Sequence, residues 1–225
     1  MAEDIVFWNE ESDKLEKASE ELGYSDIFYL VNIKEIDEVN DVQELSKNKK
    51  FIFKINYEEF KNKSFVKKMK NKFKSEKYFV ILDFSSISRD KEFINKTREV
   101  FSSKLISAVV GLEEWSKRDS FNFKSSGLSK ALCQLAVQND IALIFSLKKI
   151  ISKKGTERSK FLGRIKQNIN LCMKYKVKLC LASFAEKPNE ISSSQDMQAL
   201  AEILGMNTKI VKDSIEQDIT AKIVY

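Results

Sequence analysis

Seven short runs of apolar, β-branched and aromatic residues recur along the chain, and their spacing limits the folds it can adopt. The runs lie at residues 5–8, 27–31, 51–55, 78–82, 106–110, 141–145 and 177–181. Near-continuous apolar runs are typical of strands that are buried on both faces of a parallel sheet. The Asn-Gly and Asp-Gly turns that favour antiparallel hairpins do not occur in the sequence. The pattern therefore predicts an α/β protein.

Longer amphipathic stretches separate the runs and are expected to form helices. We expect a helix over residues 10–22 that ends at Gly23, and one continuous helix over 57–73. Thr156 is expected to cap a long basic helix. Ser192 and Gln195 match a capping box before a last helix that ends at Gly205.

Strand–helix units of this kind can form either an open, doubly wound sheet or a closed barrel. The even spacing favours a TIM-barrel-like (β/α) barrel with about seven parallel strands, and with one unit short or irregular near residues 219–225. No shift in composition marks a domain boundary, so we expect residues 1–225 to form a single domain. Residues 116–126 form the longest irregular stretch and look like an insertion.

The chain contains no histidine, which excludes several kinds of active site. Ser-His-Asp and Cys-His arrangements and histidine-ligated metal centres all need an imidazole. Cys133, Cys172 and Cys180 lack CxxC spacing, so we expect reduced, buried side chains. The acidic N-terminus and the absence of an apolar run of membrane-spanning length predict a soluble cytoplasmic protein with no membrane partner.

The net charge of +6 is unevenly distributed. Residues 1–46 hold 14 acidic residues against 3 Lys, a balance of −11, so residues 47–225 carry +17. Residues 47–77 and 146–178 supply most of the positive charge. Localised positive charge is typical of polyanion binders, but a Lys-rich helix face that is merely solvated gives the same pattern.

An enzyme with a barrel fold would carry its reactive groups just after the strand ends. This rule selects Asn32, Asn56, Asp83, Gly111, Ser146 and Ser183, with Lys54 and Lys178 inside strands. Asp83 could act as a general base or metal ligand, but one carboxylate does not make a metal site. Ser183 is expected to be a buried hydroxyl at a strand end, and Trp8 and Trp115 are expected to pack rather than to stack on bases.

Residues 126–136, SGLSKALCQLA, and residues 140–147, DIALIFSL, resemble the central signature of the RNase P protein component 3 family. The order continues with Glu157-Arg158, with KYKV at 174–177, and with Leu204-Gly205-Met206. The resemblance is strong over about residues 120–215, and it extends weakly to Gly23-Tyr24.

This resemblance implies a TIM-barrel-like fold that is related to PHP phosphoesterases but lacks their metal site. It implies an accessory subunit of ribonuclease P, which removes the 5′ leader from precursor tRNA. RNA and its bound Mg²⁺ would do the chemistry, so no catalytic residue, metal site or cofactor is expected on the protein. The implied partners are RNase P RNA, precursor tRNA in the holoenzyme, and a small ferredoxin-like RNase P protein subunit.

The resemblance and the basic segments together give the candidate RNA-binding residues. Lys148, Arg158 and Lys174 match positions that are basic in the family. Lys130 stands where members often carry His, and residues 192–196 lack an Arg found in others. The full candidate set is Lys124, Lys130, Lys148, Lys149, Arg158, Arg164 and Lys174. A degenerate PHP-type metal-dependent phosphoesterase and a scaffold that contacts only proteins remain the alternatives.

Overall fold

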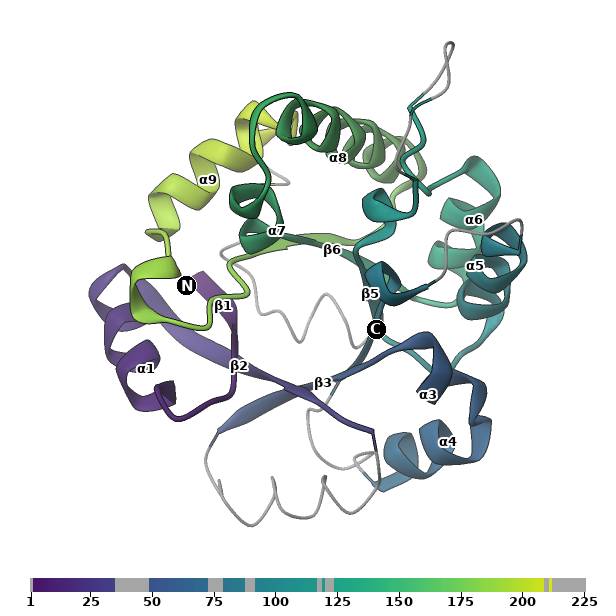
Figure 1. Ribbon diagram of the computed structural model, residues 1–225, viewed down its shortest axis with the longest axis horizontal. Coiled ribbons are helices and arrows are strands. Elements are labelled where there is room, and N and C mark those ends of the chain that lie inside the picture. Colours follow the sequence, from purple (N-terminus) through teal and green to yellow (C-terminus); the bar gives the residue numbers. More distant parts are fainter. Residues whose placement is uncertain are drawn as a thin grey trace.

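Seven parallel strands form one sheet whose order follows the sequence (Figure 1). The computed structural model describes residues 2–34, 49–72, 79–87, 92–116, 119, 124–208 and 211. The strands are β1 (Ala2–Phe7), β2 (Tyr24–Asn32), β3 (Lys50–Ile55), β4 (Phe79–Asp83), β5 (Ala108–Val110), β6 (Ala142–Ser146) and β7 (Leu179–Ala182). Each predicted run overlaps one of these strands, so the predicted strands are confirmed.

The first strand meets the segment that follows the last one, which nearly closes the sheet. Val6 forms a parallel bridge to Ala185. The backbone N–H of Phe184 donates to the carbonyl of Ile5 at 2.8 Å, and that of Phe7 donates to Ala185 at 2.8 Å. This seam confirms the barrel over the open sheet. The further unit expected near residues 219–225 lies outside the described residues, and one domain over residues 1–225 stays a prediction.

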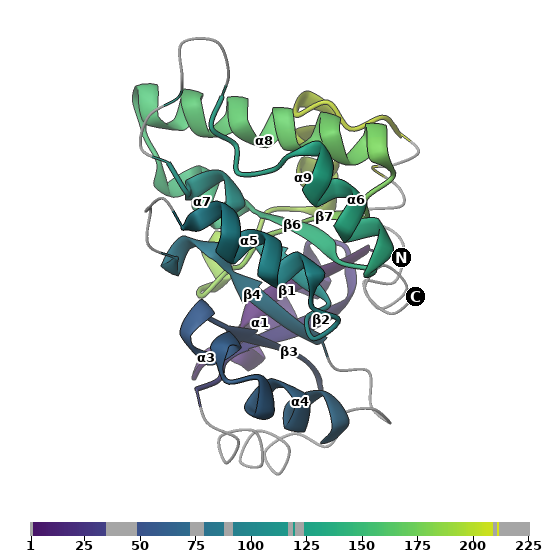
Figure 2. The ribbon, with the colours of Figure 1, turned by 90° about the vertical axis from the view of Figure 1, so that its right-hand side faces the viewer.

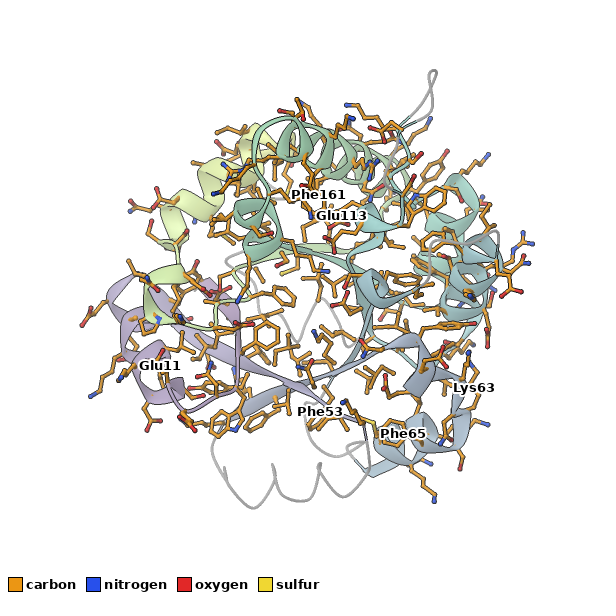
Figure 3. All side chains as sticks on the ribbon, in the orientation of Figure 1. Glu11, Phe53, Lys63, Phe65, Glu113 and Phe161 are labelled. Atoms are coloured by element: carbon orange, nitrogen blue, oxygen red, sulfur yellow. The ribbon has the colours of Figure 1, made fainter. Side chains whose placement is uncertain are left out.

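Side chains alternate between two cores, which explains why the strand sequences are apolar on both faces. One core fills the barrel interior and contains residues from every strand. The side chains that β5, β6 and β7 contribute to it include three small ones, those of Ala108, Ala142 and Ala182. The other core lies between sheet and helices and includes Tyr29 and Phe53. Figure 3 labels Phe53 on its strand.

Helices cover the outside of the barrel (Figures 1 and 2). They are α1 (Ser12–Glu21), α3 (Tyr57–Lys61), α4 (Lys63–Lys72), α5 (Phe93–Ser102), α6 (Lys130–Gln138), α7 (Leu147–Ser152), α8 (Gly155–Tyr175) and α9 (Ser194–Ile203), with 3-10 turns at Phe84–Ser86, Leu112–Glu114 and Pro188–Glu190. No helix among the described residues is long and apolar enough to cross a membrane.

Three details of the predicted helices are wrong. The helix expected over 57–73 is two helices, because Asn62 interrupts it and its Oδ1 accepts from the N–H of Phe65 at 3.1 Å. Lys154, not Thr156, precedes α8. Ser193, not Ser192, caps α9 by accepting from the N–H of Asp196 at 3.1 Å.

Candidate nucleic-acid interface

The ends of β3 to β6 bring a compact cluster of charges to the mouth of the barrel. Asp83 ends β4, and its carboxylate lies 3.4 Å from Lys54 Nζ and 3.1 Å from Lys149 Nζ. Lys149 also contacts Glu114 at 2.8 Å. Burial alone would raise the pKa of Asp83, but Lys149, Ser85 and Lys54 together hold it below its ordinary value. Asp83 is therefore an ionised partner of two ammonium groups.

A glycine makes room for this cluster. Gly111 follows β5 with φ +81°, and a Cβ placed there would lie 2.6 Å from Lys149 Nζ and 3.0 Å from Asp83 Oδ1. Glycine adopts this left-handed conformation without strain and leaves space for the ammonium group. Burial lowers the pKa of Lys149, but Asp83 and Glu114 outweigh it and keep the side chain charged.

A metal-dependent phosphoesterase would need Asp83 as a metal ligand or general base. In this structure the Asp83 carboxylate instead pairs with the ammonium groups of Lys54 and Lys149. Among the described residues, no group of three or more acidic or cysteine side chains could hold a metal ion.

Glu113 lies beside this cluster and is only 1% exposed. Its Oε1 has no hydrogen-bond partner among the described residues. Burial raises the pKa of Glu113 to about 7. A cavity of about 320 Å³ separates Glu113 from α8, and Figure 3 labels Glu113 and Phe161 at this place. The cavity is lined by Glu113, Glu114, Ser116, Lys153, Glu157, Lys160, Phe161 and Arg164.

Arg164 fastens the segment after β5 to α8. Its side chain is only 6% exposed. Nε donates to Asp119 Oδ1 at 2.7 Å, and Nη1 donates to the carbonyls of Glu113, at 3.1 Å, and Ser116. The side chain predicted to contact RNA is therefore engaged inside the protein, as is that of Lys149.

The outer side of α8 carries a shallow groove of about 560 Å³. It is lined by Lys124, Gly163, Lys166, Gln167, Asn170, Leu171 and Lys174. The structure thus brings together Lys124 and Lys174, which are 50 residues apart in the sequence. Lys166 belongs to the same groove but is missing from the predicted set, although it lies in the predicted basic segment.

The other predicted cations lie apart from this groove. Lys148 pairs with Glu186 at 2.7 Å and with Glu190 at 3.3 Å. Arg158 donates to the carbonyls of Lys153 and Ile151, and so holds the turn between α7 and α8. Lys130 is exposed at the first position of α6.

The residues predicted to be structural are confirmed as such. Ser183 is buried, and its Oγ lies 3.3 Å from the carbonyl oxygen of Ile5. Trp8 packs edge-on against Tyr29, with 5.0 Å between ring centroids, and Trp115 stacks on Phe93 at 4.8 Å. The three cysteines are free and buried.

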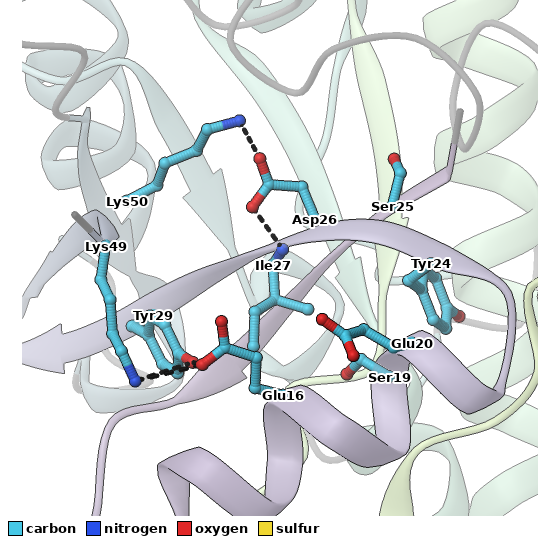
Figure 4. A pocket seen from close by; sticks show the side chains of 10 residues that line it. All are labelled: Glu16, Ser19, Glu20, Tyr24, Ser25, Asp26, Ile27, Tyr29, Lys49 and Lys50. Atoms are coloured by element: carbon cyan, nitrogen blue, oxygen red, sulfur yellow. Dashed lines mark hydrogen bonds and ion pairs between the residues drawn. The ribbon is translucent and has the colours of Figure 1, made fainter.

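A small pocket between α1 and β2 shows how the acidic N-terminal segment is neutralised (Figure 4). Lys49 Nζ lies 2.9 Å from Asp13 and 3.2 Å from Glu16. Lys50 pairs with Asp26. The start of the first basic segment therefore offsets acidic residues of the preceding one within the protein.

Comparison with known sequences gives a match to one family. Residues 119–224 match the sequence profile of RNase P subunit p30. Ribonuclease P protein component 3 of Methanosarcina barkeri is 34% identical over 83 residues, or 37% of this chain and 35% of that protein. Its counterpart in Methanosarcina mazei is 32% identical over 92 residues, covering 41% and 38% of the two chains. The matched stretches span little more than a third of these relatives.

Comparison with solved structures extends over almost the whole chain. A chain in a cryo-EM structure of archaeal ribonuclease P with mature tRNA superposes with a TM-score of 0.68 at 21% identity, covering 94% of this chain and 87% of that chain. A zinc-bound adenosine deaminase from Xanthomonas campestris gives 0.52 at 10% identity, covering 93% and 53%. At such identities the similarity establishes the barrel fold alone.

Proposed function

We propose that the protein is an RNA-binding subunit of ribonuclease P, on the premise that residues 119–224 match the sequence profile of RNase P subunit p30. The family match carries the proposal. It confirms the resemblance seen in the sequence, and it covers Lys124 and α8, which together line the groove on the outer side of α8. In this role the protein stabilises the RNase P RNA and supports removal of the 5′ leader from precursor tRNA.

The proposal assigns the chemistry to RNA and to Mg²⁺ bound by RNA. The charged cluster at the mouth of the barrel supports this assignment, because the Asp83 carboxylate already forms ion pairs with Lys54 and Lys149. A small ferredoxin-like protein subunit is the proposed partner. The cytoplasm is the proposed location.

The exposed cations Lys124, Lys130 and Lys174 are the first candidates for RNA contact, followed by the half-exposed Lys148 and Arg158. Buried ion pairs are poorly suited to bind an external phosphate, because opening them would leave carboxylates unpaired. We therefore assign Lys149 and Arg164 to positioning rather than to contact with RNA.

Reconstitution tests the proposal. The full chain is combined with the RNase P RNA and the other protein subunits of its organism, and cleavage of precursor tRNA is measured at moderate salt with and without this chain. We expect binding to the RNA and faster leader removal when the chain is present. A chain that neither binds the RNA nor changes cleavage would overturn the proposal. Association with the other subunits alone, without RNA binding, would instead identify a protein scaffold.

A further inference from the structure

Gly163 lies in the middle of α8, where glycine is unfavourable. Replacing alanine by glycine inside a helix costs about 1 kcal/mol, because glycine loses more conformational freedom. A Cβ at Gly163 would lie 2.6 Å from Lys124 Nζ and 3.1 Å from Lys124 Cε. The missing side chain is therefore what allows the end of Lys124 to lie directly on the helix.

Side chains of α8 hold the segment that carries Lys124. The carbonyl of Lys124 accepts from Gln167 Nε2 at 3.4 Å. Two residues further, the carbonyl of Ser126 accepts from Asn168 Nδ2 at 2.9 Å. On the other side of Lys124, Arg164 binds Asp119. Side chains of α8 thus hold the described residues Asp119, Lys124 and Ser126 against the helix.

The groove that results is positively charged and lacks acidic residues. It presents three lysines and the amides of Gln167 and Asn170, whereas the cavity beneath the same helix holds three glutamates. No described carboxylate pairs with Lys124, Lys166 or Lys174. Lys166 and Lys174 are eight residues apart, or about 12 Å along the helix at 1.5 Å per residue. Successive phosphates of one strand advance by about 3.4 Å along the axis of duplex DNA, so a row of this length can contact more than one phosphate of a nucleic-acid strand.

We propose that this groove binds the sugar–phosphate backbone of RNA, with Gly163 positioning the Lys124 ammonium beside Lys166 and Lys174. The inference rests on the proposed function. Lysine ammonium groups bind phosphates as point charges and do not read bases. The groove therefore supplies affinity and orientation, without sequence preference.

The experiment measures RNA binding by the full chain as a function of salt. The probes are the RNase P RNA transcript and a polyuridine strand. A variant with Lys124, Lys166 and Lys174 changed to Gln is compared with one in which Lys17, Lys67 and Lys68 are changed. The control lysines are exposed on α1 and α4, away from α8 (Figure 2). Changing them to Gln removes the same net charge as the groove variant does. We expect the groove variant to lose about 0.7–0.9 in the slope of log K against log salt for each phosphate contact removed. The control slope should stay near that of the wild type.

Gly163→Ala isolates the positioning role. The substitution favours the helix, and the atom it meets is the mobile end of a lysine, so the variant is expected to fold. It should lower the salt slope in the same direction as Lys124→Gln, and it should add nothing in a chain that already carries Lys124→Gln. Equal losses from the groove and control variants, or full additivity of Gly163→Ala with Lys124→Gln, would overturn the inference. Failure of the wild-type chain to bind the RNase P RNA would instead overturn the proposed function.

Discussion

Glu113 is a buried acid whose ionisation is expected to limit stability at neutral pH. Burial raises its pKa from 4.5 to about 7, against weaker opposing effects from its own backbone and Lys149. Glu113→Gln replaces this carboxyl with a neutral group of similar shape. The comparison of variant and wild type across pH therefore isolates the cost of ionising the side chain in the folded protein.

The magnitude follows from the two pKa values. One pH unit of difference between folded and unfolded states corresponds to about 1.4 kcal/mol, so the 2.5 units between 4.5 and about 7 correspond to about 3.4 kcal/mol. Below pH 4.5 the carboxyl is largely protonated in both states, and its stabilising contribution is fully present. As the pH rises from 4.5 to 7, the unfolded chain releases the proton first and stability falls. Above pH 7 the loss is complete.

The assay is urea unfolding of both proteins between pH 4.5 and pH 8. The amide adds some constant cost or gain of its own, so the informative quantity is the change in the difference between variant and wild type. We expect Glu113→Gln to gain about 3 kcal/mol relative to wild type across this range. Glu157→Gln is the matched control, because Glu157 lines the same cavity but its side chain is 72% exposed. A difference that does not grow with pH, or that grows equally in the control, would refute the reasoning.

Three further outcomes are expected. Lys149→Met should lower the free energy of unfolding by about 3 kcal/mol, because Asp83 and Glu114 each lose one of their lysine partners and keep Lys54 and Lys153, respectively. Lys148→Met at the half-exposed Glu186 pair should cost about 1 kcal/mol or less, and equal losses in urea unfolding would contradict this. Arg164→Lys keeps the charge, but its single ammonium nitrogen cannot reach all the acceptors that the Nε and Nη1 groups of Arg164 bind, so we expect a loss of about 2–3 kcal/mol in thermal unfolding, and an unchanged Tm would count against the assigned role. Burial raises the pKa of Asp4 from 3.8 to about 6, so stability should fall between these pH values by about 3 kcal/mol; Asp4→Asn should flatten this part of the profile, and a variant profile parallel to wild type would show that another group is responsible.

The strands were predictable because a strand that is buried on both faces consists of a nearly continuous run of apolar residues. The residues 51–55, for example, place Ile52 in the barrel interior and Phe53 in the outer core, so both faces read as apolar. The helix break at Asn62 was not predicted, because the apolar spacing on both sides continues without interruption. Only the side-chain bond from Asn62 shows that the residue begins a new helix.

The candidate site was predictable in part. Basic residues of the segment 146–178 were identified, but their sequence does not show which of them point outward. Arg164 and Lys166 are two residues apart on one helix, and one is buried while the other is exposed. The role of Gly163 could not be predicted, because it depends on Lys124, a residue 39 positions away that reaches α8 through tertiary contacts.

The seam of the barrel has a consequence for how the chain folds. Asp4 Oδ1 accepts from the N–H of Ser183 at 2.8 Å, joining residues that are 179 positions apart. All other neighbouring strands are consecutive in the sequence, so their pairing closes much shorter loops. During synthesis the edge of β1 stays unpaired until residue 185 has emerged and can pair with Val6. We therefore expect closure of the seam to be the last and slowest pairing step, and the unpaired edge of β1 to be a site where the nascent chain is exposed to aggregation.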